Sequence, residues 1–312
     1  MSFSSKVKEE LSRQCPAGRH CQIAEIAAIL SMCGRILISE RDEYTVKIHT
    51  ENITVARKYF TLLKKAYNID TEISLRRSSK MCLYTVTIRH HDEAMKVLKS
   101  SKLVDKYGDI CENLSISDNL IIQKDCCKRA FIRGAFLAAG SISAPEKFYH
   151  FEIVCGTEKK AVQLQNIIQY FDIDAKIVER KKHFVVYIKE GAGIVDILNV
   201  MEAHIALMNL ENVRILKEMR NSVNRQVNCE TANLKKTVSA AVKQIEDIKF
   251  IRDKAGLAIL SAGLEEIARL RLDNPEASLK ELGEMLTPAV GKSGVNHRLR
   301  KISEIADDLR NK

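Results

Sequence analysis

An internal repeat, offset by a little over a hundred residues, constrains the fold of this chain more than any other feature. The segments IAEIAAILSMCGRI (23–36) and AFIRGAFLAAGSI (130–142) are both helical runs rich in small residues, and they end at Gly34 and Gly140. Each glycine fits the left-handed position that closes many helices. Two copies of one unit predict a domain with pseudo-twofold symmetry, in which related helices and sheets pack face to face.

The parallel continues downstream of both glycines. Alternating apolar and polar residues predict half-buried strands, and helical periodicity predicts the segments between them. The expected strands are Tyr44–Ile48, Glu72–Arg76 and Leu83–Ile88 in the first copy, and Tyr149–Ile153, Ala175–Val178 and Phe184–Ile188 in the second. The expected helices are Thr54–Tyr67 and Lys159–Phe171. The order expected for each copy as a whole is α-β-β-α-β-β-α.

Small side chains recur four residues apart along one face of each repeated helix. The pairs are Ala24 with Ala28, Ala27 with Ser31, Ala130 with Gly134, and Gly134 with Ala138. Small side chains at this spacing let two helix backbones approach closely. Alanine-rich core helices without such pairing are the alternative, because alanine is also the best helix former. Recurrence at the same place relative to the closing glycine favours paired helices.

The run GAFLAAG at Gly134–Gly140 resembles the LAGLIDADG signature of homing endonucleases, and AILSMCG at Ala28–Gly34 resembles a degenerate second copy. In active members of that superfamily, the resemblance implies an acid before each closing glycine, which holds the divalent metal ions that cut DNA. The matching residues here are Cys33 and Ala139. Alanine offers no ligand and a thiol is a poor ligand for magnesium. We therefore expect no nuclease activity, no catalytic residue and no cofactor.

Basic residues occupy matching places in the two repeats. They are Arg76, Arg77 and Lys80 in the first copy, and Arg180, Lys181 and Lys182 in the second. Lysine and arginine could contact phosphates there and release counterions from DNA. Solvated hairpin loops, where charges often cluster, are the equally favoured alternative. These six residues are candidate secondary DNA contacts.

The net charge of the chain narrows the class of binding partner. The 312 residues carry a net charge of +10, which is compatible with an anionic partner such as nucleic acid.

The nine cysteines are scattered and form no CxxC pair. Cys15, His20 and Cys21 could share a metal ion, but their spacing matches no common site, so no metal is expected.

Neither a membrane-spanning helix nor a signal peptide is expected. No apolar run reaches about 18 residues, which is the length that spans a bilayer. The N-terminal residues alternate in charge, as an ordinary amphipathic helix does. We therefore expect a cytoplasmic protein, associated with the nucleoid, that does not contact a membrane.

The C-terminal third is expected to be all-helical. A helical run covers 201–225, and an amphipathic pattern begins again at Leu234. A second helix is expected over Lys254–Leu272, where Asp273, Asn274 and Pro275 stop it. The interruption predicts a flexible hinge over 223–233.

A helix-turn-helix is predicted over Ser278–Ile305. Ser278 and Glu281 have the spacing of a capping box, and residues 287–291 form the expected turn before a helix that Ser293 could cap. An apolar stripe of Val295, Leu299 and Ile302 would hold this second helix. Its other face supplies the predicted DNA contacts, which are Lys292, Ser293, Asn296, His297, Arg298, Arg300 and Lys301.

These residue types suit a recognition helix in the major groove. Asparagine can pair with adenine and arginine with guanine, which assigns base contacts to Asn296, His297 and Arg300. Lys292, Arg298 and Lys301 are expected to contact phosphates. The alternative is a helical hairpin with a solvated basic face.

The whole chain resembles the WhiA family of bacterial transcription regulators. The resemblance rests on SFSSKVKEEL near the N-terminus, RGAFLAAGSIS with EKFYHFEI in the second repeat, ETANLKKTV, and KSGVNHRLRKI in the predicted recognition helix. Membership would imply a metal-free DNA-binding protein tied to sporulation, cell division or chromosome segregation. It would also imply that the C-terminal module supplies most of the sequence recognition.

The sequence thus predicts an α+β protein. The expected parts are a first LAGLIDADG-like repeat at 1–106, a second at 107–222, the hinge, and an all-α DNA-binding domain at 234–312. The expected partner is double-stranded promoter DNA, together with a second regulator or RNA polymerase. An endonuclease using other acids and a protein-docking scaffold on DNA are the alternatives.

Overall fold

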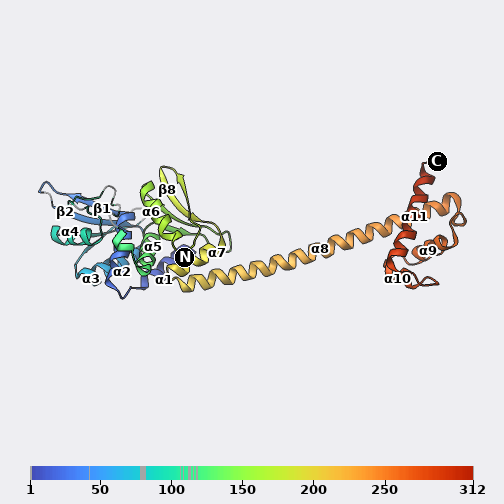
Figure 1. Ribbon diagram of the computed structural model, residues 1–312, viewed down its shortest axis with the longest axis horizontal. Coiled ribbons are helices and arrows are strands. Elements are labelled where there is room, and N and C mark those ends of the chain that lie inside the picture. The colour runs from blue at the N-terminus through green and yellow to red at the C-terminus, as the bar shows by residue number, and fades with distance from the viewer. Residues whose placement is uncertain are drawn as a thin grey trace. The chain divides into compact units, whose positions relative to one another are not determined.

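The computed structural model divides into two compact units, Met1–Lys217 and Glu218–Lys312, which are described separately (Figure 1). It describes residues 2–41, 43–77, 82–105, 107, 109–111, 114, 116 and 119–311. Among these residues, no helix is both long and apolar enough to cross a membrane.

The first unit contains two copies of the predicted α-β-β-α-β-β-α order, preceded by helix α1 (Phe3–Arg13). The first copy consists of α2 (Arg19–Cys33), β1 (Gly34–Ile38), β2 (Tyr44–Thr50), α3 (Ile53–Tyr67), β3 (Glu72–Arg77), β4 (Cys82–Ile88) and α4 (His91–Ser100). The second consists of α5 (Asp125–Ala139), β5 (Gly140–Ile142), β6 (Phe151–Cys155), α6 (Glu158–Gln169), β7 (Lys176–Arg180), β8 (His183–Ile188) and α7 (Gly191–Val200). The expected pseudo-twofold α+β architecture is confirmed.

Each copy forms one antiparallel four-stranded sheet with the same topology. The strand orders are β1-β2-β4-β3 and β5-β6-β8-β7. One face of each sheet is buried against helices, through Val46, Ile48 and Val86 in the first sheet and Ile153 and Val186 in the second. Because side chains alternate along a strand, the neighbouring residues form an open face on each sheet.

Helices α2 and α5 pack directly against each other and join the two repeats. A Cβ atom added to Gly134 would lie 2.6 Å from the Glu25 carbonyl oxygen and 2.9 Å from the Ala28 Cβ atom. Residue 134 therefore has to be a glycine for the two backbones to come this close. The predicted pairing of the small-residue helices is confirmed.

The two closing glycines are required for a different reason than the expected one. Gly34 has φ −77° and Gly140 has φ −87°, so both are extended rather than left-handed. Each glycine is also the first residue of a strand, and the chain passes from helix to strand without an intervening turn. A Cβ atom would lie 2.4 Å from the Leu30 carbonyl oxygen at Gly34, and 2.3 Å from the Phe136 ring at Gly140. Steric crowding by the preceding helical turn excludes any side chain there.

Three buried charged residues connect the helices around this pair. The Glu25 side chain is fully buried, and its carboxylate lies 3.1 Å from the Lys58 ammonium and 3.4 Å from the Arg133 guanidinium. Arg133 also donates a hydrogen bond of 2.7 Å to Glu202. Buried charges are tolerated when they are paired and hydrogen-bonded in this way.

Residues 223–233 are helical, unlike the flexible hinge that the sequence predicted. They lie within α8, a single helix from His204 to Ala255 (Figure 1). The expected break reflected a lost apolar pattern, because most side chains in this stretch are exposed. Helix periodicity disappears where no face is buried, but the segment contains neither glycine nor proline to end the helix.

The second unit places the end of α8 with three further helices around one small core. The helices are α9 (Ala262–Asp273), α10 (Leu279–Glu284) and α11 (Lys292–Arg310). The expected helix over Lys254–Leu272 is wrong, because Gly256 (φ +76°) and a 3-10 turn at Leu257–Ile259 separate α8 from α9. A left-handed residue such as Gly256 interrupts helix geometry. Ile248, Ile267, Leu282, Val295 and Leu299 form the centre of the core.

Candidate nucleic-acid interface

The predicted capping box at the start of α10 is present. The Ser278 hydroxyl accepts a hydrogen bond of 3.3 Å from the Glu281 amide, and the Glu281 carboxylate accepts one of 2.7 Å from the Ser278 amide. Hydrogen bonds from the backbone and the side chain of Ser278 hold the pKa of Glu281 below its usual value. Two of the amides that a helix start leaves unpaired are thereby satisfied.

The segment between α10 and α11 is held by a close backbone contact. The Val290 amide donates a hydrogen bond of 2.9 Å to the Gly283 carbonyl. A Cβ atom at residue 283 would lie 2.1 Å from the Val290 carbonyl oxygen, so only glycine fits. The buried side chains of Leu282, Leu286 and Val295 then fix the two helices as a pair.

Helix α11 has one buried stripe and one exposed face. Val295, Leu299 and Ile302 are buried, as expected. The predicted contact residues Lys292, Ser293, Asn296, His297, Arg300 and Lys301 are all exposed. At about 100° per residue, they lie within one half of the helix circumference, opposite the buried stripe.

Two of the predicted contact residues have other surroundings than expected. Arg298 is half-buried at the edge of the exposed face, and its guanidinium donates a hydrogen bond of 3.4 Å to the Gly263 carbonyl on α9. Ser293 does not cap α11; the N-cap is Gly291, and no side chain caps this helix. Ser293 lies in the first turn instead, since the helix begins at Lys292, two residues earlier than a serine cap at residue 293 would require.

The basic residues of the repeats lie on and beside the open sheet faces. Arg76 on β3 pairs in register with Leu83, and Arg180 on β7 pairs with His183, so the two arginines occupy equivalent strand positions. Arg77 pairs with Cys82 and belongs to the opposite face by alternation. Lys80 lies outside the described residues.

Lys181 and Lys182 form the two-residue turn between β7 and β8. Their φ angles are 49° and 64°, which is the left-handed region that a type I′ hairpin turn requires at both positions. Both side chains are exposed at the tip of the hairpin.

The open face of the first sheet carries basic residues that the sequence prediction missed. Arg35 on β1 lies directly opposite Lys47 on β2, and His49 follows on the same face. Arg76 is on this face too, two strands away. The missed signal was alternation, because Lys47 and His49 flank the core residue Ile48.

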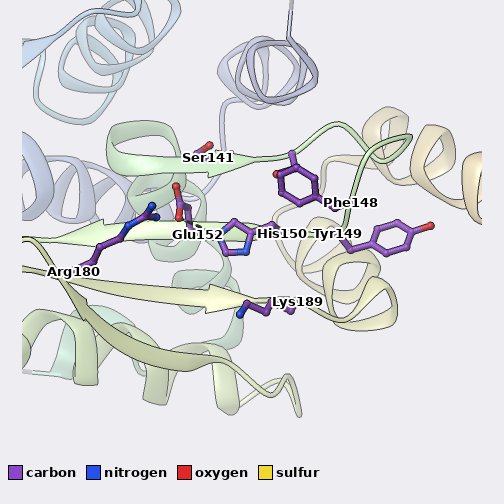
Figure 2. A pocket seen from close by; sticks show the side chains of 8 residues that line it. Ser141, Phe148, Tyr149, His150, Glu152, Arg180 and Lys189 are labelled. Atoms are coloured by element: carbon purple, nitrogen blue, oxygen red, sulfur yellow. Dashed lines mark hydrogen bonds and ion pairs between the residues drawn. The ribbon is translucent and has the colours of Figure 1, made fainter.

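The open face of the second sheet is more mixed in charge and contains a shallow pocket. Figure 2 shows its lining, with Ser141 on β5, Glu152 on β6, Arg180 on β7, and Phe148, Tyr149, His150 and Lys189. The His150 Nε2 atom lies 3.0 Å from a Glu152 carboxylate oxygen. The carboxylate makes this sheet a poorer phosphate-binding surface than the first one.

Lysines surround the position where the LAGLIDADG resemblance would require an acid. Burial raises the pKa of the Cys33 thiol to about 12, and Lys8 and Lys160 are the cations that interact with it. The Lys160 ammonium donates a hydrogen bond to the Ser31 carbonyl. A protonated thiol between two ammonium groups neither ligates a divalent cation nor attracts one.

Comparison with known proteins covers almost the whole chain. Three family models match it: the WhiA N-terminal LAGLIDADG-like domain over residues 19–104, the WhiA LAGLIDADG-like domain over 128–220, and the WhiA C-terminal HTH domain over 223–306. The crystal structure of full-length WhiA from Thermatoga maritima has the same fold, with a TM-score of 0.62 and 24% identity over 99% of both chains.

Two curated relatives are similar at the level of sequence. The probable cell division protein WhiA of Lachnoclostridium phytofermentans is 56% identical over 99% of this chain and 100% of the relative. The protein of the same name from Alkaliphilus oremlandii is 48% identical over 99% of this chain and 98% of the relative. The chain combines a degenerate LAGLIDADG-like fold with a helix-turn-helix and belongs to the WhiA family.

Proposed function

We propose that this protein binds specific sites in promoter DNA through α11 and regulates transcription there. The exposed face of α11, which is basic at its N-terminal end and lies opposite a buried stripe, is the observation that carries this proposal. The relatives are named probable cell division proteins, so the proposed regulation concerns cell division, and with it sporulation or chromosome segregation. A protein bound at promoters would associate with the nucleoid and act on RNA polymerase or a second regulator beside it.

The chemistry of α11 separates base contacts from phosphate contacts. Asn296 and Arg300 are one turn apart near the middle of the exposed face, where paired hydrogen bonds to adenine and guanine are possible. The first turn has no side-chain cap, so its free amides suit a phosphate, as do Lys292 and Lys301. The half-buried Arg298 is held toward α9 and suits a phosphate at the edge of the groove.

The proposed activity does not include DNA cleavage. The two positions that carry acids in the resembling endonucleases hold Cys33 and Ala139, and Lys8 and Lys160 add positive charge beside Cys33. These residues support binding of DNA without metal-dependent hydrolysis. Incubating the pure protein with plasmid DNA and magnesium or manganese checks this point, and cutting that persists through stringent purification would contradict it.

An electrophoretic shift on promoter fragments recovered by genomic footprinting tests the recognition helix. Replacing Arg300 by alanine should weaken specific binding about tenfold to a hundredfold, because a bidentate arginine–guanine pair contributes about 1–3 kcal/mol. Replacing Lys292 by alanine should weaken binding to all sequences and lower the salt slope by about one.

Arg252→Ala is the matched control. Arg252 is an exposed arginine near the end of α8. This end of α8 contacts the far end of α11, where Asp247 pairs with Arg310 and Lys254 donates a hydrogen bond to the Leu309 carbonyl. Loss of Arg252 should leave affinity and salt slope unchanged. Equal affinities of the Arg300→Ala variant and the control for promoter DNA would show that α11 is not the recognition helix.

A further inference from the structure

Four metal-ligating side chains converge where the two repeats meet. His20 and Cys21 lie at the start of α2, and Cys126 and Cys127 lie at the start of α5. Their ligand atoms all lie within 4.8 Å of one another. Within the part of the chain that the structure describes, His20 and Cys21 are thus joined by two cysteines of the other repeat rather than by Cys15.

The repeat itself produces this cluster. Cys21 precedes Gly34 by as many residues as Cys127 precedes Gly140, and His20 corresponds to Cys126 in the same way. Because α2 and α5 pack against each other, equivalent residues near their N-termini are brought together. Spacing along the chain could not reveal a site whose halves are 106 residues apart.

The distances suit a tetrahedral metal site. The His20 Nδ1 atom lies 3.2 Å from the Sγ atoms of Cys21 and Cys127, and 3.9 Å from that of Cys126. With zinc–nitrogen and zinc–sulfur bonds of about 2.0–2.3 Å, the edges of a tetrahedron are roughly 3.5–3.8 Å. The ligand atoms lie within 4.8 Å of one another, so changes of up to about 1 Å in their separations convert the observed arrangement into coordination geometry.

The surroundings give a metal ion access to the four donors. Both ligand pairs lie in the first turn of a helix, and a metal ion that binds there has to displace the protons of the two buried thiols, because burial raises the pKa of Cys21 and Cys127. Cys21 and Cys127 are buried, whereas His20 and Cys126 are exposed. The site is therefore anchored in the core and open on one side.

We propose that His20, Cys21, Cys126 and Cys127 bind one zinc ion, which fastens the two repeats together at the N-terminal ends of their paired helices. Three thiolates and an imidazole are the donor set of structural zinc sites, and they disfavour magnesium and calcium. A disulfide between two of these cysteines would use two sulfur atoms and leave the third thiol and the imidazole without a role. The convergence of all four donors favours the metal.

Metal analysis of the full-length protein, purified with reductant and desalted after exposure to zinc, tests this proposal. We expect about one zinc ion per chain, and replacement by cobalt should give the absorption bands of tetrahedral thiolate coordination. Zinc should also raise the thermal unfolding temperature, because it links segments that are far apart in sequence.

Variants at the two exposed ligands keep the test independent of folding. Cys126→Ser and His20→Ala remove ligands without opening the core, and each should weaken zinc binding more than about a hundredfold, since even second-shell losses cost ten- to a hundredfold. Cys229→Ser, which replaces an exposed cysteine of α8, is the matched control and should bind zinc like the wild type.

Three outcomes would overturn the proposal. One is a reduced wild-type protein that retains no stoichiometric zinc or cobalt. Another is equal zinc affinity in Cys126→Ser, His20→Ala and the Cys229→Ser control. The third is a disulfide between Cys21 and Cys127 in protein isolated without oxidation and without bound metal.

Discussion

Lys8 on α1 buries an ammonium group beside the thiol of Cys33 and above the ring of Phe136, 5.8 Å from its centroid. Burial lowers the pKa of Lys8 from 10.5 to about 8. Below pH 8 the lysine is charged in both the folded and the unfolded protein, and the folded state bears the cost of its desolvation. Between pH 8 and 10.5 the folded protein releases this proton first, so stability rises with pH in that window.

Urea unfolding at pH 7 and pH 9.5 measures this contribution. The free energy of unfolding attributable to Lys8 should increase by up to about 2 kcal/mol over that interval, because one pKa unit corresponds to about 1.4 kcal/mol. Lys8→Met should remove this increment from the pH profile and leave the rest. A Lys8→Met profile parallel to that of the wild type would show that Lys8 is not the buried amine responsible.

The residues next to Cys33 show what sequence could and could not supply at this scale. The LAGLIDADG resemblance alone identifies residues 33 and 139 as the positions of the acids, and the sequence shows that Cys33 and Ala139 stand there instead. Lys8 and Lys160 come from α1 and α6, and only the packing of these helices brings them to the end of α2. Contacts between distant segments carry no local periodicity, so no motif search could identify them.

At the scale of single elements, the α2–α5 contact should be sensitive to one methyl group. Gly134→Ala places a Cβ atom 2.6 Å from the Glu25 carbonyl, so the helices have to separate. We expect a loss of about 1–3 kcal/mol of unfolding free energy from overpacking, despite the better helix propensity of alanine. Chemical denaturation measures it, with Gly156→Ala as control, because a Cβ atom at 156 meets nothing within 4 Å. Equal stability of both variants would contradict the close approach.

The start of α10 should depend on its capping box. Ser278→Ala removes the hydroxyl that accepts a hydrogen bond from the Glu281 amide. We expect this loss to lower the local stability of α10 by about 1 kcal/mol. Hydrogen exchange of the α10 and α11 amides in the full chain reads this out. Ser293→Ala is the control, since Gly291 and not Ser293 is the N-cap of α11. Faster hydrogen exchange of the α11 amides in the Ser293→Ala variant would show that Ser293 does cap this helix.

Element prediction succeeded for most segments with a buried face, and it failed over 223–233, where no face is buried, and at Gly256, where a left-handed residue separates two helices. The strands around Ile48 and Val186 alternate because one side faces helices, and the stripe around Val295 and Leu299 has helical spacing for the same reason. The middle of α8 has no such face, so its continuity over 223–233 follows only from the absence of glycine and proline.

At the scale of the whole molecule, the first unit carries candidate residues for a second set of phosphate contacts. The salt dependence of DNA affinity distinguishes such contacts from a merely solvated surface. If Arg76 and Arg180 contact phosphates, their double replacement by alanine should reduce the slope of log affinity against log salt by about two. Arg77→Ala, on the other face of the same strand, should leave the slope unchanged. A double variant with the wild-type slope would limit DNA contact to the second unit.

The internal repeat determined most of what could be predicted at this scale. It gave the element order, the helix pairing and the degenerate endonuclease architecture, because each follows from comparing two segments of one chain. The cluster of His20, Cys21, Cys126 and Cys127 has no motif along the chain, because its two halves are 106 residues apart. Symmetry places equivalent positions together, so a superposition of the two repeats is the available signal.

The lysines beside Cys33 also bear on whether acids placed at the two LAGLIDADG positions would bind a cation in this chain. Introducing aspartates at residues 33 and 139 would place a new carboxylate beside Lys8 and Lys160, where it would form ion pairs instead of binding a cation. A cation site at residue 33 would also need the lysines of α1 and α6 to be replaced. Acid substitutions at the two LAGLIDADG positions are therefore not sufficient to create a divalent-cation site in this chain.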